Sequence, residues 1–416
     1  MNAAKQRNWK EILFSRRMVT CVFIGFTSGM PLYVLIQLVP AWLRSNDVDL
    51  ATIGLFSVVS LPYTWKFLWS PLMDRFTPPF LGRRRGWAIV TQLALMVAIG
   101  MLGMFDPSKS LGAIVGVVFA VSLFSASQDI VIDAYRRELL VDDELGTGNS
   151  FFVNAYRLSS LIPGSLALIL SDHLPWSSVF WITAGFMGVG VVTSLVIREV
   201  STGALAPQTL REAVIEPFRE FFARDGWRTA VAILAFMFLY KLGDNMATAL
   251  ATPFYLDMGF SRTEIGAIAK VAALWASVAG SIIGGIVMLK LSINRALWIF
   301  GFVQMLTILG FAWLSVRGHD PTALFIVVSA EYLGVGLGTV ALIAYIARET
   351  SRAFTATQFA LFTSFIAIPR TFANASTGFL IEAMGYTTFF LLCTAVAVPG
   401  MLMLLKVAPW NKNLIQ

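Results

Sequence analysis

The chain has 416 residues, of which 57% are hydrophobic and only 13% are charged, and its formal net charge is +7. Soluble domains carry about a quarter charged residues, because polar groups have to cover their surface. This composition excludes an ordinary soluble globule and predicts an all-α integral membrane protein.

Cysteine and histidine are scarce, with two of each. Cys21 and Cys393 fall inside apolar runs, and His173 and His319 fall in short loops. We therefore expect no disulfide framework, no metal centre and no cofactor. The basic N-terminus leads into a long apolar run without a short h-region and cleavage site, which predicts an uncleaved first span.

Twelve segments are apolar over a length that can cross a bilayer, which takes about 17 to 25 residues in a helix. They are expected near 18–43, 50–73, 86–105, 111–135, 147–170, 176–197, 229–253, 263–288, 294–315, 321–347, 354–381 and 386–406. The prediction is therefore a protein with twelve transmembrane helices.

Lysine and arginine set the orientation, because they accumulate in cytoplasmic loops. With the N-terminus inside, the cytoplasmic segments collect Lys5, Lys10, Arg16, Arg17, Arg83, Arg84, Arg85, Arg136, Arg137, Arg198, Arg211, Arg219, Arg224 and Arg228. The opposite loops hold Arg44, Lys109, Arg262 and Arg317. Both termini are therefore expected in the cytoplasm, and this bias explains the net charge without a nucleic-acid partner.

The longest cytoplasmic segment lies near mid-chain. We expect a six-helix half over 1–197, a linker over 198–228 and a second six-helix half over 229–416. The linker predicts an interfacial amphipathic helix, because five apolar residues recur at helical spacing: Leu210, Val214, Phe218, Phe221 and Phe222. "WSSVFWITA" (176–184) and "YTTFFLLCT" (386–394) are faintly similar, as parallel repeats would be.

Ionisable residues are absent from the interiors of the third, sixth, ninth and twelfth predicted spans. Other spans hold Lys66, Asp129, Arg157, Lys241, Asp244, Lys270, Glu331 and Arg370. Charges are costly in hydrocarbon, so these side chains are expected to face the bundle interior or a water-filled cavity. A scaffold of every third helix around a polar interior resembles the major facilitator superfamily.

Two glycine clusters are expected to let helices pack closely. They are Gly280, Gly284 and Gly285 in the eighth span, and Gly334, Gly336 and Gly338 in the tenth. A phosphate-binding loop is the alternative, but "GVGLG" lacks the strand that should precede such a loop.

The loop "SPLMDRFTPPFLGRRRGW" joins the second and third spans and is rich in charge. It resembles the superfamily's cytoplasmic loop motif, which implies a conformational latch formed by Asp74, Arg75, Arg83, Arg84 and Arg85. The alternative is that the arginines only enforce topology. Asp133 lies within a turn of Arg136 and Arg137, so we expect an ion pair at the cytoplasmic rim and group it with the latch.

Longer strings narrow the resemblance. "KFLWSPLMDRFTPPFLGRRRGW", "SASQDIVIDAY", "LYKLGD" and "TATQFAL" resemble the AmpG-type muropeptide permease family, from "GFTSGMPL" through to "AVAVPG". This implies a proton-driven importer of the bacterial inner membrane for N-acetylglucosaminyl-1,6-anhydro-N-acetylmuramyl peptides, used in cell-wall recycling. Muropeptide permeases of the family carry two further C-terminal spans. Shorter members include siderophore permeases, and a distant branch carries acetyl-CoA, so another anionic solute is the alternative.

The resemblance also implies which residues function: Asp129, Lys241, Asp244, Lys270, Glu331 and Arg370. Asp129 lies on an apolar helix four residues before Asp133, so desolvation and a neighbouring carboxylate both favour its neutral form. That suits proton coupling, with Glu331 as the second candidate. A permanent salt bridge from Asp129 to Lys66, Arg157 or Lys241 is the alternative, and Lys241 and Asp244 could also simply neutralise each other.

The expected cavity holds more positive than negative charge, which suits an anionic solute. Its cations are Lys66, Arg157, Lys241, Lys270 and Arg370, and its anions are Asp129, Asp244 and Glu331. Gln128 and an aromatic set would complete it, because sugar rings pack on aromatic faces: Tyr33, Tyr63, Trp65, Tyr156, Tyr240, Trp275 and Tyr332. The expected partners are an anionic amino-sugar peptide, protons and lipid, and the expected unit is a monomer.

Two other classes were weighed. An enzyme is not expected, because serines and carboxylates have no histidine partner. A sensor built on the same scaffold is disfavoured by the charges retained in both halves.

Overall fold

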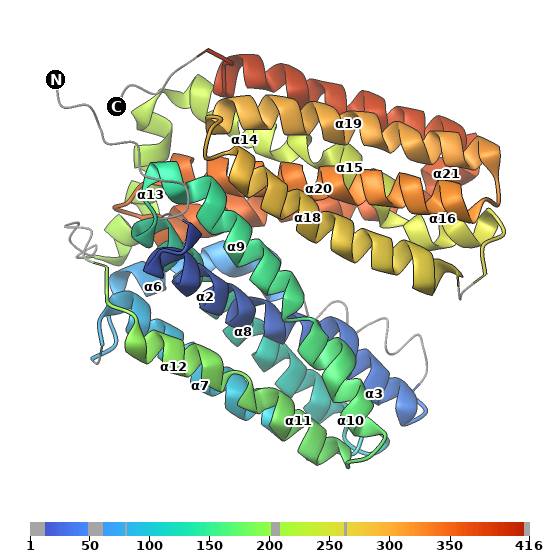
Figure 1. Ribbon diagram of the computed structural model, residues 1–416. Helices are drawn as coiled ribbons and strands as arrows, with labels where there is room; N and C mark the ends of the chain where they lie inside the picture. Colours follow the sequence, from blue (N-terminus) through green and yellow to red (C-terminus); the bar gives the residue numbers. More distant parts are fainter. Residues whose placement is uncertain (1–12, 49–60, 80, 201–208, 262–263, 412–416) are drawn as a thin grey trace. The chain divides into compact units, whose positions relative to one another are not determined.

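The computed structural model describes residues 13–48, 61–79, 81–200, 209–261 and 264–411. Within them the chain folds into helices joined by turns (Figure 1). Ten helices there are long and apolar enough to cross a membrane, and Thr355–Ala367 forms a shorter apolar helix. The all-α prediction is confirmed. The count of twelve spans stays a prediction, because the start of the expected span 50–73 lies outside the described residues.

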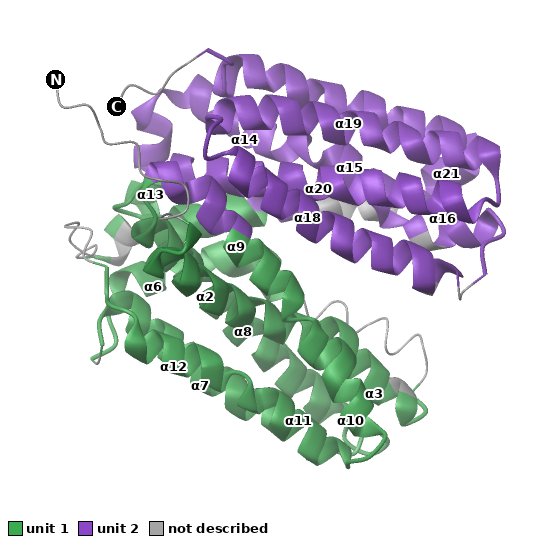
Figure 2. Cartoon of the chain, in the orientation of Figure 1, with its two compact units in different colours: residues 1–141, 151–218, 350–364 green, residues 142–150, 219–349, 365–416 purple. Residues whose placement is uncertain are grey.

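Contacts divide the chain into two compact units (Figure 2). Unit 1 takes residues from 1–141, 151–218 and 350–364, and unit 2 takes residues from 142–150, 219–349 and 365–416. The start of α9 therefore groups with unit 2, and the start of α21 groups with unit 1. The predicted halves 1–197 and 229–416 remain a prediction about the repeat.

The helical elements of the first part of the chain follow the predicted spans closely. They are α2 (Arg16–Tyr33), η1 (Val34–Leu38), α3 (Val39–Ser45), α5 (Leu61–Trp65), η3 (Lys66–Leu68), α6 (Ser70–Arg75), α7 (Arg83–Leu102), α8 (Leu111–Leu139), η4 (Asp142–Glu144), α9 (Leu145–Leu158), η5 (Ile162–Leu166), α10 (Ala167–Ser171), α11 (Trp176–Gly185) and α12 (Gly188–Val196).

The second part begins with the linker helix. Its elements are α13 (Leu210–Arg224), α14 (Trp227–Tyr240), α15 (Leu242–Ala249), α16 (Ala251–Asp257), η6 (Ile265–Lys270), α18 (Val271–Val287), α19 (Ile293–Arg317), α20 (Pro321–Glu349) and α21 (Thr355–Val407). The predicted linker helix is confirmed as a helix. In α21 the backbone turns at Gly385, with φ 75° and ψ 163°, between the two predicted spans 354–381 and 386–406.

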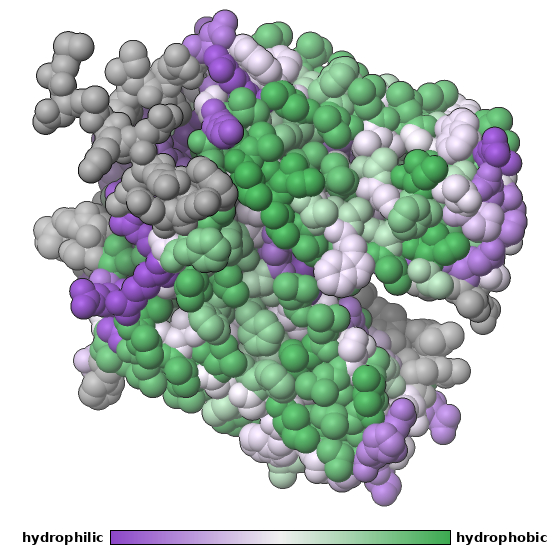
Figure 3. All heavy atoms as spheres, in the orientation of Figure 1, coloured by the Kyte–Doolittle hydropathy of each residue, from purple (hydrophilic) through white to green (hydrophobic). Residues whose placement is uncertain are grey.

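Each unit has its own apolar core. In unit 1 the core includes Trp42, Leu95 and Phe180, and in unit 2 it includes Phe311 and Phe390. Many outward apolar side chains remain exposed in the protein alone, and they cover much of the visible face, with hydrophilic residues near helix ends (Figure 3). This inverted surface is the one that a hydrocarbon environment requires.

The glycines of α18 and α20 bring these two helices into backbone contact. A Cβ atom on Gly336 would collide with the Ser277 carbonyl oxygen, and one on Gly280 would collide with that of Leu333. The prediction that these glycines serve close helix packing is confirmed.

Candidate functional site

The helix α8 carries the carboxylates that the sequence singles out. Asp129 is buried, at 9% exposure, and its Oδ1 accepts a hydrogen bond of 2.6 Å from the Ser28 hydroxyl of α2. Asp129 also lies within electrostatic reach of Lys66 and Asp133. The first carboxylate is thus held by a neutral hydroxyl donor instead of a direct ion pair with any described residue.

Asp133, and not Asp129, forms the ion pairs with the neighbouring cations. Its carboxylate lies 3.7 Å from Lys66 Nζ and 2.9 Å from an Arg136 guanidinium nitrogen. The Arg136 guanidinium also stacks over the Phe152 ring, with its carbon 3.7 Å from the ring centroid. The expected Asp133–Arg136 ion pair is confirmed. Lys66, Asp129, Asp133 and Arg136 therefore form one set of two cations and two carboxylates, which we call the α8 charge cluster; Asp133 is half-buried and the other three are buried.

Tyrosines surround the α8 charge cluster. Tyr63 donates its hydroxyl hydrogen to Ser125 at 2.7 Å, and Tyr33 packs edge-on against Tyr156 with ring centroids 5.9 Å apart. Tyr156 lies within electrostatic reach of Asp129. Three of the predicted aromatic residues, Tyr33, Tyr63 and Tyr156, therefore lie beside the predicted proton site, where an apolar sugar face could pack. Trp65 does not join them in the described contacts: it is 50% exposed and lies against Phe67.

Gln128 is fully buried beside them, and neither of its amide atoms has a hydrogen-bond partner within the described residues. Arg157 is half-buried in the C-terminal turn of α9. An unpaired buried amide is costly unless something satisfies it. Gln128 therefore remains the polar group of unit 1 best suited to bind a solute.

Unit 2 holds a second buried cluster. Lys241 Nζ lies 2.7 Å from the Asp244 carboxylate, so the sequence-predicted pair forms. Glu331 of α20 is fully buried and lies within electrostatic reach of both residues. Lys241, Asp244 and Glu331 thus combine one cation with two carboxyl groups, and we call them the α20 charge cluster.

One glutamine that the sequence analysis did not single out adjoins the α20 charge cluster. Gln304 lies on α19, is 3% exposed and has no hydrogen-bond partner for either amide atom within the described residues. The point where a Cβ atom of Gly338 would sit is close to Gln304 Oε1 and 3.9 Å from Lys241 Nζ. The ninth span has no ionisable residue, so the pattern of charges gave no signal. A lone polar amide within an apolar run was the available clue.

Three predicted cavity lysines occur where a helix is interrupted. Lys66 begins the 3₁₀ segment η3, and Lys270 ends the π-helical segment η6. Lys241, with φ −105° and ψ 2°, separates α14 from α15. Interrupted helices in membrane transporters leave backbone groups available and occur where a helix lines a site. No feature of the sequence that we used predicted these interruptions.

The remaining predicted cavity residues are less closely grouped. Lys270 is exposed, and Tyr332 is half-buried beside Glu331. Tyr240 is buried, and its hydroxyl donates to the Leu297 carbonyl oxygen at 3.0 Å, so it already has a structural partner. Arg370 belongs to α21, but its side chain lies outside the described residues.

The loop motif forms a buried network in unit 1. Asp74 of α6 lies 3.0 Å from Arg84 of α7, and Arg84 lies 2.7 Å from Glu138 of α8. Both ends of the network reach the first turn of α21. Asp74 Oδ2 accepts hydrogen bonds from the backbone N–H and the hydroxyl of Thr357, at 2.9 and 2.8 Å. The Thr355 hydroxyl accepts a hydrogen bond from Arg84 and donates one to Glu138.

The start of α21 explains why a carboxylate is bound there. The first N–H groups of a helix have no partner within that helix, and a carboxylate is favoured there. Asp74 supplies one, and the apolar side chains of Met73, Ala88, Ile130, Ala356 and Ala360 pack around the contact. Glu138, Thr355 and Thr357 were missed by the sequence reasoning, although "TATQFAL" places two threonines where a helix begins.

The other predicted latch residues have different partners. Arg83 lies 3.9 Å from Glu138 and donates to the Asp74 carbonyl oxygen, so it joins the network. Arg85 donates to the carbonyl oxygens of Ser194 and Leu195. Arg75 lies over the Phe76 ring and makes no ion pair within the described residues. Asp133 belongs to the α8 charge cluster and not to this network.

Comparisons with known proteins identify the family of the chain. A family model described as Major Facilitator Superfamily matches residues 21–374. The chain is 46% identical over 410 residues to an uncharacterized protein of Haemophilus influenzae, covering 96% of each chain. It is 40% identical over 391 residues to the anhydromuropeptide permease of Escherichia coli, covering 94% of this chain and 79% of that one.

Among solved structures, the human organic anion transporter MFSD10 superposes with a TM-score of 0.69 at 14% identity. The match covers 94% of this chain and 99% of that one. At this identity the likeness concerns the fold, and it confirms the predicted superfamily architecture.

Proposed function

Because the chain belongs to the AmpG-type permease family of the Major Facilitator Superfamily, we propose that it imports 1,6-anhydro-muropeptides in symport with protons, for cell-wall recycling. It is a multi-pass membrane transporter of small molecules and not an enzyme, in line with its named relatives. The observation that carries the substrate is the 40% identity over 391 residues to the anhydromuropeptide permease of Escherichia coli.

The surplus of positive charge predicted for the cavity is absent from the two charge clusters, which together hold three cations and four carboxyl groups. The support that they give to an anionic substrate comes from their buried lysines. Lys66 and Lys241 are buried and each is held by a carboxylate, Asp133 or Asp244. A carboxylate of an entering peptide can replace either one, because the lysine then keeps a negative partner in a poorly solvated site. A solute without negative charge could not displace either carboxylate without leaving the lysine buried and unpaired.

The Asp129 carboxylate is our proposed proton site. Its hydrogen bond comes from Ser28, a neutral donor, and it shares the cation Lys66 with Asp133. Protonation would remove one of two nearby negative charges and strengthen the hold of Asp133 on Lys66. Glu331 is the second candidate, with Asp244 as its neighbour, because two buried carboxyl groups there face one lysine.

The buried network at the start of α21 is our proposed latch. Asp74, Arg83 and Arg84 join Glu138, Thr355 and Thr357 there. The contact between Asp74 and Thr357 can hold α21 only while α6 and α21 lie together, so a transport cycle that moves this segment has to break it.

We further propose that the protein lies in the bacterial inner membrane, has both termini in the cytoplasm and functions as a monomer. The arginine-rich ends of α2, α7 and α8 carry the Lys/Arg excess that marks the cytoplasmic side. The orientation is tested independently of the substrate, as described in the Discussion.

The decisive experiment is uptake of labelled anhydro-muropeptide into vesicles of known orientation, with a ferric siderophore as competitor. Saturable uptake that a protonophore abolishes and the siderophore does not inhibit is expected. Siderophore uptake without muropeptide uptake would remove the substrate assignment while leaving the family unchanged. A vesicle preparation with Lys241→Gln controls for binding to lipid, because this variant should lose the specific component.

A further inference from the structure

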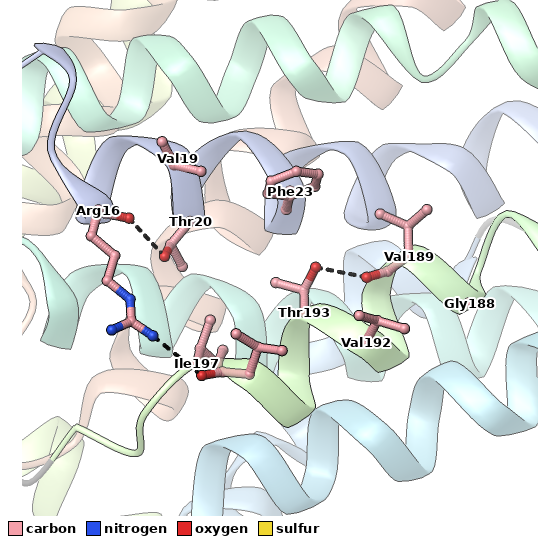
Figure 4. A pocket seen from close by; sticks show the side chains of 10 residues that line it. Arg16, Val19, Thr20, Phe23, Gly188, Val189, Val192, Thr193 and Ile197 are labelled. Carbon is pink, nitrogen blue, oxygen red and sulfur yellow. Dashed lines mark hydrogen bonds between the residues drawn. The ribbon is translucent and has the colours of Figure 1, made fainter.

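An apolar groove of about 440 Å³ lies between α2 and α12 of unit 1, and none of its lining residues belongs to either charge cluster (Figure 4). Its walls are formed mainly by Val19, Phe23, Val189, Val192 and Val196. Val192 and Val196 are 60% and 64% exposed in the protein alone, and both helices belong to membrane-spanning segments. The groove therefore opens toward the hydrocarbon of the bilayer.

The hydroxyl groups of the groove are already occupied. Thr20 donates to the Arg16 carbonyl oxygen at 2.9 Å, and Thr193 donates to that of Val189 at 2.6 Å (Figure 4). A sugar or a peptide would find few hydrogen-bond partners along these walls. The occupant that suits them is an alkyl chain, which gains free energy from burial without needing polar partners.

One end of the groove is basic. The Arg16 guanidinium donates to the Val196 carbonyl oxygen at 3.4 Å, which holds it across the groove mouth (Figure 4). Arg85 donates to the two preceding carbonyl oxygens, those of Ser194 and Leu195, at 2.9 and 2.7 Å. The C-terminal end of α12 thus gathers two guanidinium groups, as expected of cations at the negative end of a helix dipole.

A guanidinium has five N–H donors in a fork that matches a phosphate group. Arg16 is exposed, so its other donors can contact a headgroup while the alkyl chain follows Val19 and Phe23. From this combination of alkyl-lined walls and an arginine-bearing mouth, we propose that the α2–α12 groove binds an anionic glycerophospholipid, with its phosphate on Arg16 and one acyl chain in the groove. The leaflet follows the orientation proposed above, but lipid binding does not depend on the transported substrate.

Unit 2 offers a natural control. A groove of about 410 Å³ between α19 and the end of α21 is lined by apolar residues, including Phe302, Val398 and Leu402, and none of its lining residues is charged. Arg295 lies over the lining residue Trp410, with its guanidinium carbon 5.8 Å from the ring centroid. In an Arg295→Gln background the unit 2 groove should therefore accept acyl chains without preferring an anionic headgroup. A difference in headgroup selectivity between the two grooves would therefore reflect Arg16 and not the apolar walls.

The test is native mass spectrometry of the delipidated, purified protein, titrated with phosphatidylglycerol and with phosphatidylcholine of the same acyl chains. The wild type should bind phosphatidylglycerol more tightly. Arg16→Gln should weaken phosphatidylglycerol binding about fivefold, since one basic residue near an anionic surface contributes about 1 kcal/mol. It should weaken phosphatidylcholine binding less, because the choline cation of that headgroup offsets the charge of its phosphate.

Two further variants separate the parts of the site. Val192→Trp fills the α2–α12 groove and should reduce the binding of both lipids there, whereas Val398→Trp fills the unit 2 groove and should leave the preference for phosphatidylglycerol intact. Equal binding of the two lipids by the wild type, or an Arg16→Gln protein that keeps its preference, would overturn the proposal. Loss of the preference for phosphatidylglycerol when inorganic phosphate alone is added would also overturn the proposal, since the site would then bind an anion without needing a lipid.

Discussion

Asp74 and Thr357 stand 283 residues apart in the sequence, yet one carboxylate oxygen of Asp74 accepts both the backbone N–H and the hydroxyl of Thr357. Asp74 is fully buried and also lies 3.0 Å from Arg84. A residue of a loop motif thus caps a helix that begins near the end of the chain. This contact makes α6 a part of the packing of α21.

Asp74→Asn should loosen this network. Asparagine keeps the shape but removes the charge that faces Arg84, and breaking a buried ion pair typically costs about 3 kcal/mol. We expect a lower midpoint of thermal unfolding in detergent and slower uptake. Arg75→Gln, in the same motif but without an ion pair in the described structure, is the matched control. Equal effects of both variants would contradict a specific role of the Asp74 network, because Arg75 makes none of its contacts.

Asp129→Asn should separate binding from coupling. The amide oxygen can still accept from Ser28, so the site keeps its shape while resembling the protonated form. Exchange of substrate across the membrane is expected to persist, and accumulation driven by a proton gradient is expected to be lost. Counterflow and protonophore-sensitive uptake in the same vesicles measure the two. Accumulation at wild-type levels would transfer the coupling role to Glu331.

Asp133→Asn is the matched control on the same helix face. It leaves Lys66 and Arg136 without their carboxylate, so its main effect should be on stability, by about 3 kcal/mol. Its loss of proton-driven accumulation should be smaller than that of Asp129→Asn when uptake is corrected for the amount of folded protein.

Gln304→Leu should affect transport more than stability. The amide of Gln304 lies unpaired beside Lys241, so replacing it with an apolar side chain of similar size should be nearly neutral for folding. If the amide oxygen holds Lys241 when Asp244 or Glu331 carries a proton, the variant should lose accumulation at an unchanged unfolding midpoint.

Gln92→Leu provides the comparison for Gln304. Gln92 on α7 accepts a hydrogen bond from Ser194 at 3.1 Å, so its loss strands a partner and should cost about 1 kcal/mol of stability. It should spare coupling. A Gln304→Leu protein that behaves like Gln92→Leu would assign Gln304 a purely structural role.

Glu220→Cys tests the orientation. Position 220 lies on α13, which is expected in the cytoplasm, so an impermeant thiol reagent added to intact cells should not label it. His173→Cys, in an expected exterior loop, should be labelled. The native cysteines Cys21 and Cys393 are both buried and are not joined in a disulfide, and their burial keeps the background labelling low. Labelling at 220 from outside would refute the orientation.

The sequence by itself determined the membrane class, the helical spans and the family, because hydropathy, helical periodicity and contiguous strings are local properties. It also placed Asp129 and Asp133 on one helix face and paired Lys241 with Asp244, since residues three or four apart on a helix are neighbours. The linker helix and the glycine contacts of α18 and α20 followed from the same local patterns.

Only the tertiary structure decided which charges meet across helices. In the folded protein Lys66 pairs with Asp133 and not with Asp129. Thr357 donates to Asp74, and Gln304 lies beside Lys241. These choices depend on how far each helix slides and rotates against its neighbours, which is set by packing of whole surfaces and has no counterpart in the spacing of residues along one helix.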